Sequence, residues 1–262
     1  LPPELFPGTW EINVASSITA MDPGAYRLTV SCDGYQAEPA TITALARPAT
    51  GEPATADLTV TRGFPGVFRG EVEAVVEGFR KEREVELEKT DEWTHAFTLD
   101  ATTPRASFHL VMDEAVANLH TDCAVNILDA SGKAVRQTGF DGTEVHIGVG
   151  LPDGQDEARF TLQVVGAFAI AADMAEWGFT VEETYRFASP VCGAVDGQGP
   201  GPLRLYCGVP NELALSFDGA WPAAPDGMGY TGAVRFRDAA TGDRRPGDRG
   251  GRTVLEVPIA VD

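Results

Sequence analysis

Large apolar and polar residues alternate with a period of two along much of this chain, and this alternation limits its fold more than any other feature. Clear examples are Trp10–Val14, Tyr26–Val30, Ala56–Val60 and Phe160–Val164. Such a period places one set of side chains on each face of an extended strand and is typical of half-buried antiparallel strands. Turn dipeptides separate these runs at Pro7-Gly8, Pro23-Gly24, Asp33-Gly34, Asp141-Gly142, Asp153-Gly154 and Asp226-Gly227. The sequence therefore predicts an all-β fold of tandem antiparallel β-sandwich or jelly-roll modules.

The segment from Glu71 to Lys89 is the one place where the residues also suit a helix, because it is rich in Glu, Lys and Arg. Its apolar members Val85 and Leu87 are two residues apart, and Gly70 and Gly78 interrupt it. We therefore predict charged edge strands here, with the helix as the alternative. Charged edges oppose edge-to-edge aggregation.

Internal similarity divides the chain into three predicted units. The phrase from Ile12 to Val30 resembles the phrase from Ile147 to Val164, as if each were the last hairpin of a similar module. We expect residues 1–62 to hold the closing strands of a first β-module and a connector. Residues 63–188 are expected to form a complete β-sandwich or jelly-roll module. Residues 189–262 open with a Gly/Pro-rich linker and are expected to form a small C-terminal β-unit.

The charge is strongly acidic: 20 Lys and Arg face 39 Asp and Glu, a formal net charge of −19. Such a surface repels phosphate backbones and anionic lipids, so nucleic acid and membrane surfaces are not expected partners. We find no stretch of the roughly 20 apolar residues that a membrane span needs. We expect a secreted, extracellular or periplasmic setting, with any export signal outside this sequence.

Four cysteines, none in a C-x-x-C pair, argue against a zinc ribbon or a thioredoxin-type site. Cys192 and Cys207 flank a Gly/Pro-rich turn, and we predict a disulfide between them across a hairpin-like return. Buried free thiols are the alternative. The pairing of Cys32 and Cys123 stays open.

Readable catalytic motifs are absent from the sequence. It has no G-x-S-x-G elbow, no H-E-x-x-H and no phosphate-binding glycine loop. The paired acids Asp91-Glu92, Asp113-Glu114 and Glu182-Glu183 point to opposite faces of a strand and do not converge as a glycosidase's carboxylates must. The histidines appear spread over strands rather than clustered, at positions 95, 109, 120 and 146. We therefore expect no catalytic residue in this chain.

Two weaker ligand sites are indicated. Aspartates crowd the predicted loops of the middle unit, and Asp122, Asp129 and Asp141 are candidate calcium ligands, although none fits the EF-hand pattern. Asx-turns are the alternative role for such residues. Trp221 lies in a predicted loop and is the candidate for an exposed, ligand-stacking ring. No other cofactor is indicated.

Short phrases of the chain resemble a known family. Leu5–Val14 followed by Ala25–Val30 is similar to the phrase that follows the catalytic domain of large bacterial subtilisin-like serine peptidases, with the tripeptidyl-peptidase II-like members nearest. Thr121–Lys133 with Phe160–Val164 resembles the jelly-roll modules that trail many secreted peptidases. The triad contexts D-[ST]-G, H-G-T-H and G-T-S-M-A are all missing, so no catalytic residue carries over.

The resemblance implies a non-catalytic accessory region of a secreted subtilisin-like peptidase, acting in folding, substrate access, attachment or assembly. Its partner would be the catalytic domain of the same parent chain. The alternative is an independent extracellular β-sandwich that binds carbohydrate or another cell-surface ligand.

Overall fold

The fold is all-β and antiparallel, as the alternation predicts. A computed structural model describes residues 34–43, 45, 53–63, 67–88, 92–112, 122–140, 142–167, 176–196, 202–218, 221–238 and 253–261. These ranges hold no helix, and all pairings between their strands are antiparallel. The strands are β1 (Tyr35–Glu38), β2 (Ala54–Arg62), β3 (Val67–Glu88), β4 (Glu92–Asp100), β5 (Arg105–Met112), β6 (Asp122–Asp129), β7 (Ala134–Gly139), β8 (Glu144–Gly150), β9 (Glu157–Ala167), β10 (Glu176–Asp196), β11 (Leu203–Tyr206), β12 (Pro210–Phe217), β13 (Gly229–Asp238) and β14 (Thr253–Val261).

One half of the molecule is a nearly closed barrel. Its strands run in the order β1-β2-β12-β10-β3-β13-β14, with β11 added beside β3. Ile42, just after β1, pairs with Ile259 of β14, and hydrogen bonds of 2.8 Å and 2.9 Å join Ile42 to Pro258 and Ala260. This contact brings the two ends of the strand order together. Phe68, Phe217 and Phe236 are buried inside.

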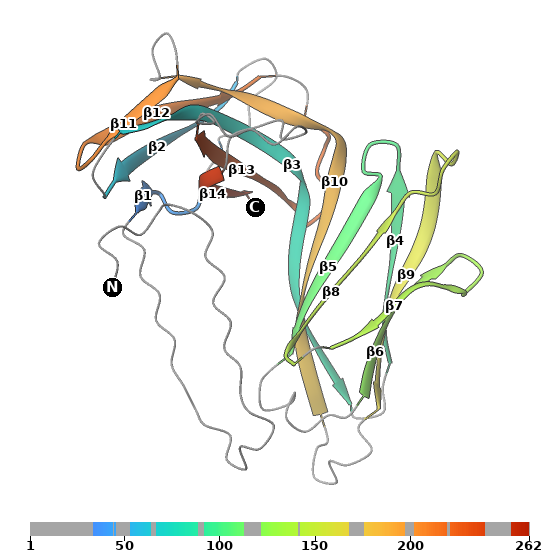
Figure 1. Cartoon of the computed structure of the whole chain (residues 1–262). Helices are drawn as coiled ribbons and strands as arrows, with labels where there is room; N and C mark the ends of the chain where they lie inside the picture. The colour runs from blue at the N-terminus through green and yellow to red at the C-terminus, as the bar shows by residue number, and fades with distance from the viewer. Residues whose placement is uncertain are drawn as a thin grey trace, which may run out of the picture.

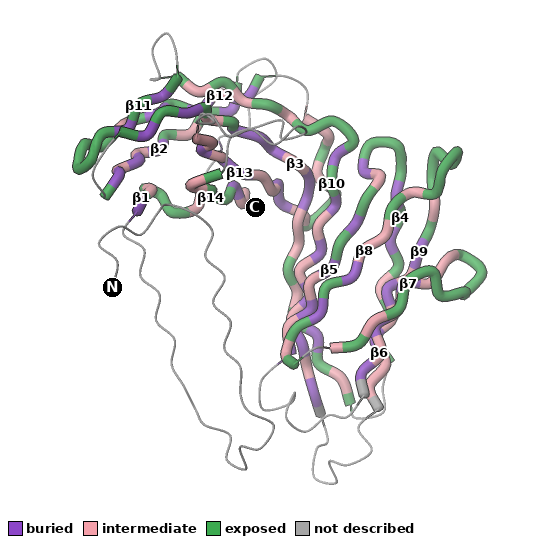
Figure 2. The backbone as a smooth tube through the Cα atoms, in the orientation of Figure 1, coloured by how far each residue is buried: buried purple, intermediate pink, exposed green. Residues whose placement is uncertain are grey.

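The other half is a two-layer sandwich, seen on the right of Figure 1. One layer joins β8 and β5 to β10 and β3, and the other has the order β4-β9-β6-β7. Phe97 of β4 meets Phe108 of β5 across the layers at a ring-centroid distance of 4.9 Å, and Trp93 meets Phe179 at 5.7 Å. Buried and exposed positions alternate along these strands (Figure 2).

Two long strands belong to both halves. β3 has 22 residues and β10 has 21, and both bend from the barrel into the sandwich (Figure 1). Buried side chains from both halves form one connected core. Burying apolar side chains on both sides of this corner stabilises the two halves together.

The corner itself is built from bulges around Glu77. Gly78 pairs with Arg186 of β10 and Thr231 of β13, whereas the next paired residue of β3 is Val76 on both sides. Glu77 is therefore left out of both ladders, and such bulges bend a strand. Its carboxylate accepts hydrogen bonds from Arg235 at 2.7 Å and Arg186 at 2.9 Å. The Arg235 hydrogen bond, with both positive charges, holds the pKa of Glu77 below its usual range despite partial burial.

The segment from Glu71 is strand rather than helix, as predicted, but only part of it is an edge. Residues 74–80 of β3 lie between β10 and β13, whereas residues 81–88 pair with β10 alone among the described strands. Charges are tolerated there because Glu82, Glu84, Glu86 and Glu88 point outward.

The predicted units need correction at their junctions. Residue 62 does end β2, but residue 189 lies inside β10, and residues 189–196 are strand rather than linker. β2, from the first predicted unit, pairs with β12 from the last. The sandwich is thus inserted between two stretches of chain that build one barrel. The strands predicted around Trp10 and Tyr26 lie outside the described residues.

Candidate functional site

A cleft of about 630 Å³ opens beside β4, where the sandwich meets the barrel. β4 is the end strand of its sheet, and among the described strands it pairs only with β9. The loop 221–228 forms the opposite wall and is fixed by a 2.9 Å hydrogen bond from the Tyr230 hydroxyl to the Pro222 carbonyl. The lining is mainly apolar and includes Phe79, Phe97, Tyr185, Pro222, Pro225 and Met228.

A buried carboxylate lies beneath this cleft. Glu183 of β10 has no exposed surface. Its side chain points inward and that of its neighbour Glu182 points outward, because successive residues of a strand face opposite sides of the sheet. Its Oε1 accepts from Arg83 Nη2, and its Oε2 accepts from His95 Nε2 at 2.8 Å and from the Tyr185 hydroxyl at 3.1 Å. We call these four residues the Glu183 cluster. It joins β3, β4 and β10.

The contacts of His95 select one tautomer. Nε2 must carry the hydrogen that Glu183 accepts, so Nδ1 is free to accept from Arg83 Nη1, 3.4 Å away. The ring also stacks between Trp93 and Phe97. His95 is therefore held on both nitrogens and both faces, which is a structural setting rather than that of a mobile general base.

The ionisation of the cluster favours a fixed charge pair. Burial raises the pKa of Glu183, but its hydrogen bonds and electrostatic interactions with His95, and then those with Arg83, outweigh it and leave the pKa below its usual range. Burial and the neighbouring Glu183 charge raise the pKa of Tyr185. Both groups thus keep their ordinary charge states at neutral pH.

Asp100, the acid that lines the cleft, is also engaged in hydrogen bonds within the protein. Its Oδ1 accepts from the backbone amides of Thr103 at 2.7 Å and Thr102 at 2.8 Å. The Thr103 amide is the main cause that lowers the pKa of Asp100. No serine or cysteine is among the residues that line the cleft. Glu183 and Asp100, the two acids at the cleft, are thus both engaged in hydrogen bonds within the protein.

We predict that Glu183 makes stability depend on acid pH. The pKa of Glu183 is lower in the folded protein than in the unfolded chain, where it is about 4.3. The ionised carboxylate therefore makes its full contribution to the free energy of unfolding above about pH 4.3, and this contribution is lost as the pH falls through the pKa of the folded protein. The urea midpoint of the wild type should therefore approach that of Glu183→Gln as pH is lowered from 7 to 3. A gap between the two that stays constant over this range would contradict the assignment.

The structure does not bring Cys192 and Cys207 together. Both are exposed free thiols. Cys192 lies opposite Val75 of β3, while Tyr206, next to Cys207, lies opposite Val67. The eight positions between Val67 and Val75 correspond to about 25 Å of strand, against the 4.4–6.8 Å between Cα atoms that a disulfide needs. The predicted hairpin-like return is wrong, because β11 continues along β3 in the direction of β10.

The other predicted site residues take structural roles where they are described. Asp129 Oδ1 accepts from Ser131 and Lys133 in the turn after β6, as an Asx-turn does. The side chains of Asp122 and Asp141 lie outside the described residues. Trp221 is only partly exposed and packs edge-on against Phe217 at 5.8 Å and Tyr230 at 5.0 Å. These contacts support the loop beside the cleft.

Two groups of side chains escaped the sequence analysis. The sequence correctly placed Glu182 and Glu183 on opposite faces of a strand. It did not show the partners of Glu183, because Arg83 and His95 come from other strands. The expectation that the histidines are spread out is wrong for His109 and His146, which lie opposite each other on β5 and β8. Only the pairing register could have shown either group.

The comparisons with known proteins assign no family. No protein-family model matches the chain, and a search of curated proteins finds no match. Among solved structures, PliG from Aeromonas hydrophila, described as a periplasmic lysozyme inhibitor of g-type lysozyme, matches at 13% identity. The match covers 42% of this chain and 88% of that one, with a TM-score of 0.28, too low to carry an argument. Within the described residues no helix has the length and apolar character to cross a membrane.

Proposed function

We propose that this chain is a non-catalytic accessory region of an exported protein and that its cleft binds an extended polypeptide segment along β4. The observation that carries this proposal is the outer edge of β4, which no described strand pairs and which lies beside an apolar cleft. An edge strand offers unpaired backbone N–H and C=O groups, to which an extended peptide can add as a further strand.

The lining of the cleft supports a peptide ligand. Phe79, Phe97 and Met228 offer apolar contact, while the two acids nearest the cleft are already hydrogen-bonded within the protein. A cleft of this kind gains affinity from backbone hydrogen bonds and from alternate side chains of the bound strand. Leu5–Val14, Ala25–Val30 and Thr121–Lys133 resemble regions that follow the catalytic domain of subtilisin-like peptidases. In such a parent chain the bound segment would belong to the catalytic domain.

Selection of short random peptides on the purified protein tests the proposal, with affinity then measured by fluorescence polarisation. Ala96 is exposed on β4 and lines the cleft, so Ala96→Arg should weaken binding of a selected peptide by more than about tenfold, or 1.4 kcal/mol. Ala214→Arg, on an exposed position of β12 away from the cleft, is the matched control and should bind as the wild type does.

Two outcomes would overturn the proposal. One is that no selected peptide loses affinity in Ala96→Arg. The other is that a glycan array gives a ligand whose binding Ala96→Arg abolishes while peptides do not bind, which would favour a carbohydrate-binding module. Casein turnover by the purified protein that a serine-directed inhibitor abolishes would contradict the non-catalytic part.

A further inference from the structure

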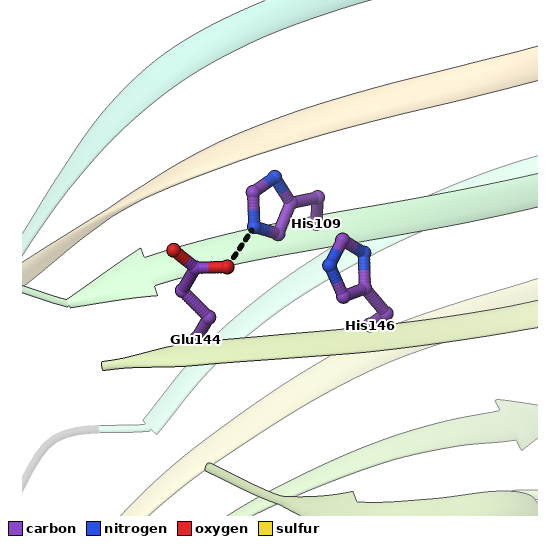
Figure 3. A group of neighbouring side chains, drawn as sticks. All are labelled: His109, Glu144 and His146. Carbon is purple, nitrogen blue, oxygen red and sulfur yellow. Dashed lines mark hydrogen bonds and ion pairs between the residues drawn. The ribbon is translucent and has the colours of Figure 1, made fainter. Parts of the chain in front are cut away.

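The outer face of the sandwich, on the other side of the sheet from the Glu183 cluster, carries a compact group of metal-ligating side chains. His109 of β5 and His146 of β8 are directly opposite each other in the antiparallel pair. Their rings are stacked, with centroids 4.0 Å apart and planes 9° apart. Glu144 lies two residues before His146 and therefore on the same face of β8. Figure 3 shows the three side chains together above the two strands.

We propose that His109, Glu144 and His146 form a binding site for a divalent transition-metal ion of the Zn²⁺ class. One ligand atom from each residue lies within 4.8 Å of the others, and His109 Nε2 is 3.3 Å from Glu144 Oε2. Ligand atoms bound tetrahedrally at 2.0–2.1 Å from zinc are about 3.3 Å apart. The His109–Glu144 pair already has this spacing, and rotation of the exposed His146 ring completes the set.

The ligand types select the class of metal. Two imidazoles and one carboxylate suit Zn²⁺ and its late first-row neighbours, whereas Ca²⁺ and Mg²⁺ prefer oxygen ligands alone. Three protein ligands leave at least one coordination position for water or for a group from another molecule. Glu144 is more than half exposed and His109 about a third, so an ion can reach them from solvent.

The surrounding charge favours a cation. The register places His146, His109, Glu182 and Glu82 in one row across β8, β5, β10 and β3. Glu84, Glu86 and Glu88 continue the acidic face along β3. His109, His146 and Glu182 line a shallow hollow whose lining includes one cation, Arg186, and its charge is paired with Glu77 at 2.9 Å. Arg80 and Arg105 lie farther along the same face. The local field therefore adds to the attraction of the three ligands.

Calorimetric titration of chelator-treated, tag-free protein with ZnCl₂ tests the site. The wild type should bind one ion, and His109→Gln and His146→Gln should each weaken binding by more than about tenfold, because each removes one of only three protein ligands. Glu86→Gln removes an exposed acid from the same face without touching the group, and it should bind Zn²⁺ as the wild type does. Imidazole ¹⁵N shifts should report direct coordination.

Titration with CaCl₂ separates a built site from general attraction to the acidic face. Ca²⁺ should bind weakly at most, and its binding should not respond to the histidine substitutions. The proposal fails if the wild type binds no Zn²⁺, or if the double variant His109→Gln/His146→Gln binds it equally well. It also fails if Glu86→Gln weakens binding as much as the histidine substitutions do. Unchanged urea midpoints in all variants would exclude unfolding as the cause of a loss.

Discussion

Replacement of Glu183 by alanine is expected to lower the free energy of unfolding by about 3–5 kcal/mol, the usual cost of removing one partner of a buried charge pair. The carboxylate is fully buried and is the shared acceptor for Arg83, His95 and Tyr185. Without it, the Tyr185 hydroxyl is left buried with no acceptor from Glu183, which alone costs about 1–3 kcal/mol. Arg83 is partly exposed and can turn toward water, which limits the total. Urea denaturation at neutral pH measures the change.

The neighbouring residue gives the matched control. Glu182 lies one position earlier on β10 but points outward, so Glu182→Ala should change stability by no more than about 0.5 kcal/mol. A double-mutant cycle with Arg83→Met should show that the two losses are not additive, because both substitutions break the same contact. Equal losses in Glu183→Ala and Glu182→Ala would mean that the Glu183 cluster does not hold the layers together.

Several of the described strands and turns were readable from the sequence. Period-2 alternation located β2 and β9, and the turn dipeptides place Gly142, Gly154 and Gly227 at positive φ, where glycine is favoured over other residues. The spacing of Val85 and Leu87 correctly favoured strand over helix for β3. These features depend on residues close in sequence, so local patterns suffice to predict them.

The partners of the strands were not readable, and the site depends on them. Alternation shows which side chains share a face but not which strand lies beside another. The barrel needs β2 to pair with β12, more than 140 residues later, and nothing in either strand specifies this. For the same reason the sequence did not show that His109 lies opposite His146. The glycines after Cys192 suggested a hairpin return, whereas β11 in fact continues along β3.

The corner at Glu77 depends on a glycine that no other residue can replace without displacing backbone. A Cβ built at Gly78 would lie 1.8 Å from the carbonyl oxygen of Tyr185 and 2.8 Å from its carbonyl carbon. Both atoms are backbone of β10, the strand that pairs with β3 along the sandwich, so rotation of a side chain cannot relieve the contact. A substitution must therefore separate the two shared strands where they bend.

Gly78→Ala is accordingly expected to destabilise the protein by about 3 kcal/mol or more, at or above the upper end of ordinary overpacking costs. The substitution should also disturb the Glu183 cluster, because it displaces the backbone of Tyr185, whose hydroxyl donates a hydrogen bond to Glu183. Gly150→Ala is the control: a Cβ at Gly150 would meet only the Pro104 carbonyl oxygen, at an ordinary 3.8 Å. That variant should stay within about 1 kcal/mol of the wild type, with a small gain from the less flexible unfolded chain. Urea denaturation measures both, and a Gly78→Ala variant as stable as Gly150→Ala would show that β3 and β10 are not in close backbone contact at the corner.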